Sequence, residues 1–118
     1  MILRLIAGGV AALCLSFSTF SAYAEAPGTS NKARVNYILF CAGCHRLDGS
    51  GSPESQVPDL REHLAGFARF EAGREYLVQV PGSATVPLND VDLADVINWI
   101  LKNINKVDFD ETTPALTG

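Results

Sequence analysis

Two cysteines and a histidine lie close together in the pentapeptide C-A-G-C-H, residues 41–45. Cysteines three positions apart project to the same side of a helical turn, and the next residue points one step further around it. C-x-x-C-H is the signature of covalent haem attachment: two sulfurs bond one porphyrin, and the imidazole faces its iron. We therefore expect Cys41 and Cys44 to carry one haem c, with His45 as the proximal iron ligand.

The first 24 residues have the layout of a secretory signal peptide. Arg4 supplies a positive charge, an apolar run follows, and Ala22 and Ala24 occupy the positions that a signal peptidase reads. We expect cleavage after Ala24, which leaves residues 25–118 as a single domain in the oxidising periplasm. A retained membrane anchor is the alternative, although the apolar run is short for a span of about 20 residues.

Three other chemistries compete for the C-A-G-C-H pentapeptide. A structural zinc site needs four ligands, and beyond the pentapeptide residues 25–118 add one histidine, His63. A thioredoxin-like dithiol would follow a strand, whereas a helix is expected before Cys41. A simple Cys41–Cys44 disulfide is the third alternative. Haem is favoured because thioether bonds remove two oxidisable thiols and prevent loss of the cofactor outside the cell.

The charge balance narrows the classes of partner. Residues 25–118 carry eight basic and 13 acidic side chains, a formal charge of −5. An acidic chain without a basic cluster argues against nucleic-acid binding, which depends on Lys and Arg neutralising phosphates. The negative charge of this chain would instead steer a redox partner with a basic patch toward it. We expect no stable membrane anchor after signal cleavage.

Helices are expected at both ends of the domain. The first covers residues 32–41, is capped by one of residues 29–31, and has an apolar face formed by Val35, Ile38 and Leu39. The second follows Asn89 as its cap. Its apolar stripe consists of Leu93, Val96, Ile97, Ile100 and Leu101. Two such stripes imply that the end helices pack on each other.

The middle of the chain is expected to be rich in loops. Glycines and prolines exclude regular structure from residues 46–59. Residues 60–70 favour a short helix or turn, and residues 72–82 fit either a strand or a helix. Residues 83–89 read as a loop and residues 108–118 as a polar tail. So much loop leaves a small core, which a cofactor would stabilise.

Beyond the pentapeptide, the chain resembles the class I cytochromes c. In that family a helix ends in C-x-x-C-H, a glycine-rich loop and a Pro-x-Leu element follow, and a C-terminal helix crosses the first. Here D-G-S-G-S (48–52), V-P-D-L (57–60) and a final helix within residues 88–101 occupy those places. The resemblance covers about residues 32–102. It implies an all-α, small cytochrome c-like fold, with N- and C-terminal helices packed across the haem and long loops between them, and it favours a helix over residues 72–82.

The resemblance also assigns roles outside the pentapeptide. The carbonyl of Pro58 would accept a hydrogen bond from Nδ1–H of His45, which turns Nε2 toward the iron. Leu60 would pack on the ring. The family's distal ligand is a methionine before the last helix, but the sole methionine of this chain is Met1. His63 is therefore a candidate distal ligand, and an open sixth position or an unexpected ligand are the alternatives.

The family implies an electron carrier rather than an enzyme. The haem iron would cycle between its ferric and ferrous states while the protein positions it and tunes its potential. Its partners would be periplasmic redox proteins: a dehydrogenase, an oxidase or another cytochrome. Two alternatives follow. One is a haem-based module that binds small ligands or reacts with peroxide at an open sixth site. The other is a haem subunit of a larger dehydrogenase complex.

Overall fold

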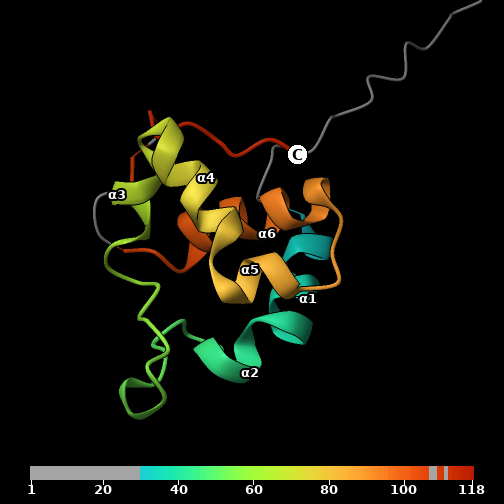
Figure 1. Ribbon diagram of the computed structural model, residues 1–118, viewed down its shortest axis with the longest axis vertical. Helices are drawn as coiled ribbons and strands as arrows, with labels where there is room; N and C mark the ends of the chain where they lie inside the picture. Colours follow the sequence, from blue (N-terminus) through green and yellow to red (C-terminus); the bar gives the residue numbers. More distant parts are fainter. Residues whose placement is uncertain (1–29, 107–108, 111) are drawn as a thin grey trace, which may run out of the picture.

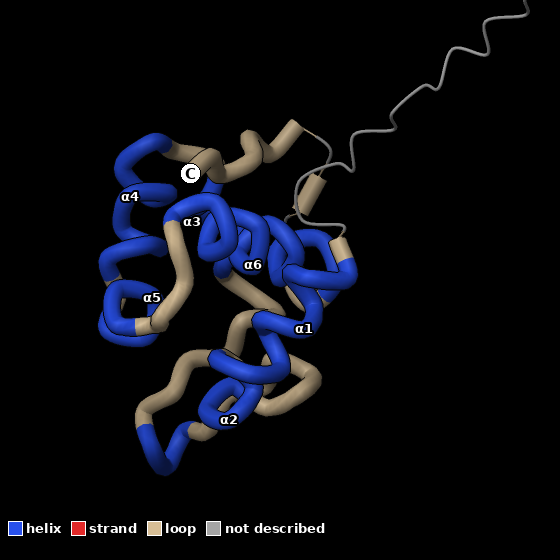
Figure 2. Tube along the Cα trace, turned by 90° about the vertical axis from the view of Figure 1, so that its right-hand side faces the viewer, coloured by secondary structure: helices blue, strands red, loops and turns tan. Residues whose placement is uncertain are grey.

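The computed structural model describes residues 30–106, 109–110 and 112–118. Within these ranges the chain consists of helices joined by loops and turns, with no β-strand (Figure 2). The expected all-α fold is confirmed. In the same ranges no helix is long and apolar enough to cross a membrane. The signal peptide predicted over residues 1–24 lies outside the described residues.

The first helix, α1, spans Asn31–Phe40 and begins where it was expected. The side chain of Ser30 caps it by accepting a hydrogen bond from the backbone N–H of Ala33 at 3.0 Å. The helix buries Ala33, Asn36 and Tyr37. The prediction that α1 packs through Val35, Ile38 and Leu39 is wrong, because these residues are 39–65% exposed. The small side chain of Ala33 lets the helix approach the core closely, and the ring of Tyr37 fills part of that core. A pattern of aliphatic residues does not reveal this combination.

The last described helix, α6, spans Asp90–Asn103 and packs against α1 (Figure 1). Asn89 caps it as predicted, since its side chain accepts a hydrogen bond from the N–H of Asp92 at 2.9 Å. Acidic residues in the first turn stabilise the helix, because their negative charges lie near the positive end of the helix dipole. The predicted stripe lies in the core, with Leu93 partly buried and the other four members buried: Val96, Ile97, Ile100 and Leu101.

Two apolar clusters meet along α6. The first lies between α1 and α6 and consists of Tyr37, Val96, Ile100 and Ile104. The second joins α6 to the middle helices and the C-terminal segment. Its members are Ala65, Ala68, Leu77, Ala94, Ile97, Leu101 and Leu116. Because α6 contributes to both clusters, it is the element that connects the two halves of the core.

Three helices form the middle of the chain: α3 (Leu64–Ala68), α4 (Glu71–Gln79) and α5 (Pro81–Thr85). Helix α4 decides residues 72–82 in favour of a helix rather than a strand. Helix α5 corrects the prediction that residues 83–89 are entirely loop. Proline is well suited to the first turn of a helix, and the Thr85 hydroxyl bonds the carbonyl of Pro81 at 2.7 Å.

The C-terminal segment was predicted to be a polar tail, but part of it packs on α6. Leu116 is buried in the second cluster. The buried side chain of Asn98 makes two hydrogen bonds to the backbone of Leu116. Its Nδ2 donates to the Leu116 carbonyl at 2.9 Å, and its Oδ1 accepts from the Leu116 N–H at 2.8 Å. This pair of hydrogen bonds resembles the pairing of two backbones. It depends on the side-chain amide of Asn98, which in the sequence is a polar residue within an otherwise apolar helix face.

The remaining elements lie together at one end of the molecule (Figures 1 and 2). They are the short helix α2 (Ala42–His45) and the loop that follows it. The loop contains one turn of 3₁₀-helix, η1 (Pro53–Ser55), and a single antiparallel bridge between Ser52 and Val57. This end of the molecule contains the residues that the sequence selected for chemistry.

Candidate functional site

The pentapeptide C-A-G-C-H forms a helical turn directly after α1. Cys41 ends α1 with its N–H bonded to the Tyr37 carbonyl at 2.9 Å, and its own carbonyl accepts the N–H of His45 at 2.9 Å. Cys41 is half-buried and Cys44 is exposed, and no disulfide joins them. The two thiols and the imidazole therefore lie on one turn, held between α1 and the following loop.

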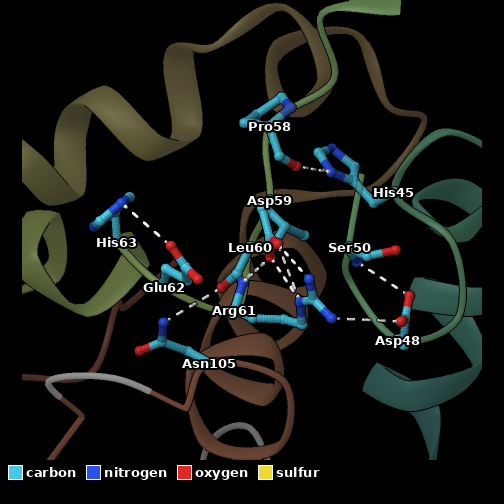
Figure 3. A network of polar contacts seen from close by, with 10 residues as sticks. All are labelled: His45, Asp48, Ser50, Pro58, Asp59, Leu60, Arg61, Glu62, His63 and Asn105. Atoms are coloured by element: carbon cyan, nitrogen blue, oxygen red, sulfur yellow. Dashed lines mark hydrogen bonds and ion pairs between the residues drawn. The ribbon is translucent and has the colours of Figure 1, made fainter. Parts of the chain in front are cut away.

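The imidazole of His45 contacts the backbone of the loop opposite. Its Nδ1 lies 3.2 Å from the carbonyl oxygen of Pro58 (Figure 3). With the proton on Nδ1 this contact is a hydrogen bond and leaves the lone pair of Nε2 free. Burial lowers the pKa of His45, and the bond to Pro58 partly opposes that effect. A neutral ring with a free Nε2 is the form that ligates metals. The contact inferred from the family resemblance is present, and the iron-ligating role of His45 stays a prediction.

Gly51 makes the approach of Pro58 possible. Its φ is +67°, and its N–H donates to the carbonyl of His45 at 3.1 Å. A Cβ at this position would lie 2.5 Å from the Pro58 carbonyl oxygen, closer than real side chains come. Glycine is thus required both for the backbone conformation and for the space in which the acceptor of His45 lies.

A second contact holds the turn that follows His45. The hydroxyl of Tyr37 donates to the backbone carbonyl of Arg46 at 2.6 Å. Arg46 has φ +64° and ψ 168°, a backbone conformation that residues other than glycine rarely adopt. The Tyr37 ring packs against Trp99 of α6, with ring centroids 5.3 Å apart. Burial raises the pKa of Tyr37 to about 12. Sequence reasoning missed this tyrosine, whose one signal was an aromatic residue one turn before Cys41.

The structure places the two remaining candidates differently. Leu60 is half-buried against the cluster between α1 and α6, and its N–H donates to the Gly49 carbonyl at 2.8 Å. The side chain of His63 is 81% exposed, with Nε2 3.7 Å from the carboxylate of Glu62. Figure 3 shows His63 and His45 on opposite sides of the segment 58–61. Pro58 is therefore brought to His45, whereas His63 is not.

The donor set fits a haem attached through its edge. Both sulfurs are free to form thioethers, and the imidazole keeps Nε2 available. Apolar side chains flank the pentapeptide at the surface, among them Leu39, Phe40 and Leu47. A large apolar ring system would cover such surface. In residues 30–106, 109–110 and 112–118, no group of three or more His, Cys, Asp or Glu could hold a metal ion directly, as a zinc site requires.

Comparison with curated proteins finds a short, well-matched segment. Forty residues, 34% of this chain, are 48% identical to a cytochrome c-552 of Thermus thermophilus, and they span 30% of that protein. Forty residues also match a second cytochrome c-552, from a designated strain of the same organism, at 48% identity and span 26% of it. The matched part is thus less than a third of each relative's length. No family model matches the chain, and no solved structure matches it.

Proposed function

We propose that this chain is a c-type cytochrome that carries single electrons through one covalently attached haem. The observation that carries the proposal is the contact between His45 Nδ1 and the Pro58 carbonyl at 3.2 Å. It holds an imidazole beside two free thiols on one helical turn and leaves Nε2 for iron. The 48% identity to cytochrome c-552 over 40 residues supports the same conclusion.

Each residue of the site has a defined task in this proposal. Cys41 and Cys44 hold the haem by thioether bonds, His45 ligates the iron through Nε2, and Pro58 fixes the orientation of the imidazole. Leu60 contributes apolar surface beside the ring. The haem supplies a one-electron ferric–ferrous couple, so one electron enters from a donor and the same electron leaves to an acceptor. No side chain of the chain serves as acid, base or nucleophile.

Covalent attachment is the decisive test. The full chain is produced in a host that attaches haem to exported proteins, denatured, and examined for haem that stays with the polypeptide. The spectrum of the pyridine complex then counts the thioether bonds. We expect two bonds in the native chain, one in Cys44→Ala and none in the double variant with Cys41→Ala. Cys14→Ala is the matched control and retains both. A colourless native chain would overturn the proposal.

Export and partners complete the proposed function. The signal peptide over residues 1–24 delivers the domain to the periplasm, and mass spectrometry of the exported protein is expected to place its new N-terminus at Glu25. A periplasmic dehydrogenase donates the electron, and an oxidase or another cytochrome accepts it. The charge of −5 on residues 25–118 favours a basic docking patch on such partners. Transfer rates are then expected to fall as ionic strength rises, and rates independent of salt contradict this steering.

A second candidate function follows from the position of His63, whose side chain is 81% exposed and directed toward Glu62. If the sixth iron position is open, the protein binds small ligands such as CO or NO, or reacts with peroxide. Spectra of the ferric protein, and of the ferrous protein with and without CO, separate the candidates. A high-spin haem that binds CO at once favours the ligand-binding module. A low-spin, CO-inert haem favours the carrier, and loss of that state in His63→Ala identifies His63 as the ligand.

A further inference from the structure

The Pro58 carbonyl that contacts His45 belongs to a segment held from both sides. On one side Leu60 donates to the Gly49 carbonyl at 2.8 Å, and the bridge between Ser52 and Val57 closes the loop. On the other side the segment directly after α6 contributes two donors. The N–H of Lys106 reaches the carbonyl of Arg61 at 2.8 Å, and the side chain of Asn105 reaches that of Leu60 at 3.3 Å. The backbone around Pro58 is therefore fixed by elements distant in sequence.

Arg61 adds a charged connection across the same segment (Figure 3). Its guanidinium binds Asp59 through two parallel contacts, Nε to Oδ1 at 2.9 Å and Nη2 to Oδ2 at 2.6 Å. The Arg61 backbone N–H also donates to Asp59 Oδ1 at 2.8 Å. The three bonds close a rigid turn immediately after Pro58. Parallel arginine–carboxylate bonds of this kind combine strength with a defined geometry.

The same guanidinium reaches the loop that follows His45. Arg61 Nη1 lies 3.7 Å from Asp48 Oδ2, and Oδ1 of Asp48 accepts the N–H of Ser50 at 3.1 Å. Arg61 thereby connects the turn after His45 with the turn after Pro58, the two turns that flank the imidazole–carbonyl contact. We refer to the contacts of Arg61 with Asp59 and Asp48 as the Arg61 clamp.

The charges of the Arg61 clamp agree with its geometry. Hydrogen bonds from Arg61 lower the pKa of Asp59 to about 2, so that its carboxylate is ionised at neutral pH. The Asp59 bond in turn raises the pKa of Arg61. The side chains of Arg61 and Asp59 are about one third exposed, whereas Asp48 is 63% exposed. The Asp59 contact is consequently the stronger part of the clamp, and the longer Asp48 contact is the part that salt weakens.

We propose that Arg61 is a positioning residue that sets the strength of the His45–Pro58 hydrogen bond and, through it, the reduction potential of the haem iron. The inference rests on the proposed function. A hydrogen bond from Nδ1 makes an imidazole a more basic ligand, and a more basic ligand favours ferric over ferrous iron. A loosened clamp weakens the bond and raises the potential.

The test uses the full haem-bearing protein and Arg61→Lys, which keeps the positive charge but loses the two-pronged contact with Asp59. We expect several-fold faster hydrogen exchange of the His45 Nδ1–H, measured by NMR in the reduced protein, together with an upward shift in reduction potential. Arg69→Lys is the matched control, because it alters an arginine–carboxylate pair with Asp110. It is expected to change neither quantity.

A second variant keeps the inference testable if Arg61→Lys folds poorly. Asp59→Asn removes the charged partner of Arg61 and is expected to accelerate Nδ1–H exchange in the same direction. Unchanged exchange and potential in well-folded Arg61→Lys would overturn the inference, as would an equal effect of Arg69→Lys. These outcomes differ from failure of the proposed function, in which the native chain carries no covalent haem and has no potential to measure.

Discussion

The hydroxyl of Tyr37 donates a 2.6 Å hydrogen bond to the backbone carbonyl of Arg46. This bond joins the buried face of α1 to the residue that directly follows His45. The same tyrosine packs on Trp99 of α6, so the turn that carries the candidate haem ligands is anchored to the main helix pair. Substitutions at this anchor, at the glycine beside Pro58 and in the contact with the C-terminal segment are expected to have separable effects.

Removal of the Tyr37 hydroxyl is expected to destabilise the protein. Tyr37→Phe keeps the ring and loses the bond to Arg46, which should lower the free energy of unfolding by about 1 kcal/mol. Urea denaturation at neutral pH measures the difference. Tyr76→Phe, at an exposed tyrosine, is the control and is expected to have little effect. An equal loss in both variants would show that the Arg46 contact contributes nothing.

The same tyrosine predicts a loss of stability in alkali. Burial raises the pKa of Tyr37 from 10.0 to about 12, so between these values the folded state binds more protons than the unfolded state. The free energy of unfolding therefore falls as pH rises from about 10 to about 12, and this contribution is complete below pH 10. Denaturation across that range should show a steeper decline in the native protein than in Tyr37→Phe. Parallel curves would contradict the assignment.

Gly51→Ala is expected to disturb the acceptor of His45. The new Cβ would lie 2.5 Å from the Pro58 carbonyl oxygen, and alanine is strained at φ +67°. We expect a loss of more than about 1 kcal/mol in the free energy of unfolding and faster exchange of the His45 Nδ1–H. Gly66→Ala, in helix α3, adds a Cβ with no atom within 4 Å outside its chain neighbours and the backbone of its own helix. It should be neutral or stabilising by up to about 1 kcal/mol.

Arg46→Gly is expected to stabilise the protein. The native φ of +64° and ψ of 168° cost a residue with a side chain about 1–3 kcal/mol, whereas glycine loses roughly 0.5–1 kcal/mol in entropy. The net gain of about 1 kcal/mol is measured by denaturant unfolding. Arg46→Ala removes the guanidinium but keeps the strain, and it should therefore show no such gain. Equal stabilisation by both variants would assign the effect to the side chain.

Asn98→Ala is expected to release the C-terminal segment. The variant loses both hydrogen bonds to the Leu116 backbone, at a cost of about 1–3 kcal/mol for the buried groups left unpaired. Limited proteolysis should then cleave the segment faster. In a chain shortened after Asp110 the same substitution should cost much less. A cost that is unchanged in the shortened chain would mean that Asn98 acts within α6 alone.

The sequence was most informative where the controlling contacts are local. The cap at Asn89 and the apolar stripe of α6 depend on residues three or four positions apart, and both were predicted. The helical turn formed by C-A-G-C-H follows from its spacing in the same way. The family resemblance added the Pro58 carbonyl, which the structure places 3.2 Å from the imidazole. It also favoured a helix at residues 72–82, which α4 confirms.

Predictions failed where the structure of a segment depends on a contact with residues distant in sequence. Helix α1 buries Ala33 and packs Tyr37 against α6, whereas the more hydrophobic Val35, Ile38 and Leu39 lie at the surface. The C-terminal segment packs because Asn98 meets the backbone of Leu116, 18 residues away.

The sequence by itself carried the proposed chemistry, because the covalent haem attachment that we propose depends on residue types and spacing within one helical turn. The tertiary structure decided how that turn is held. Tyr37 holds the backbone at Arg46, and Gly51 leaves the space that Pro58 occupies. Arg61 connects the loops on either side. These contacts join segments that approach only after the chain has folded, when packing and hydrogen bonding offset the entropy lost in ordering the loops.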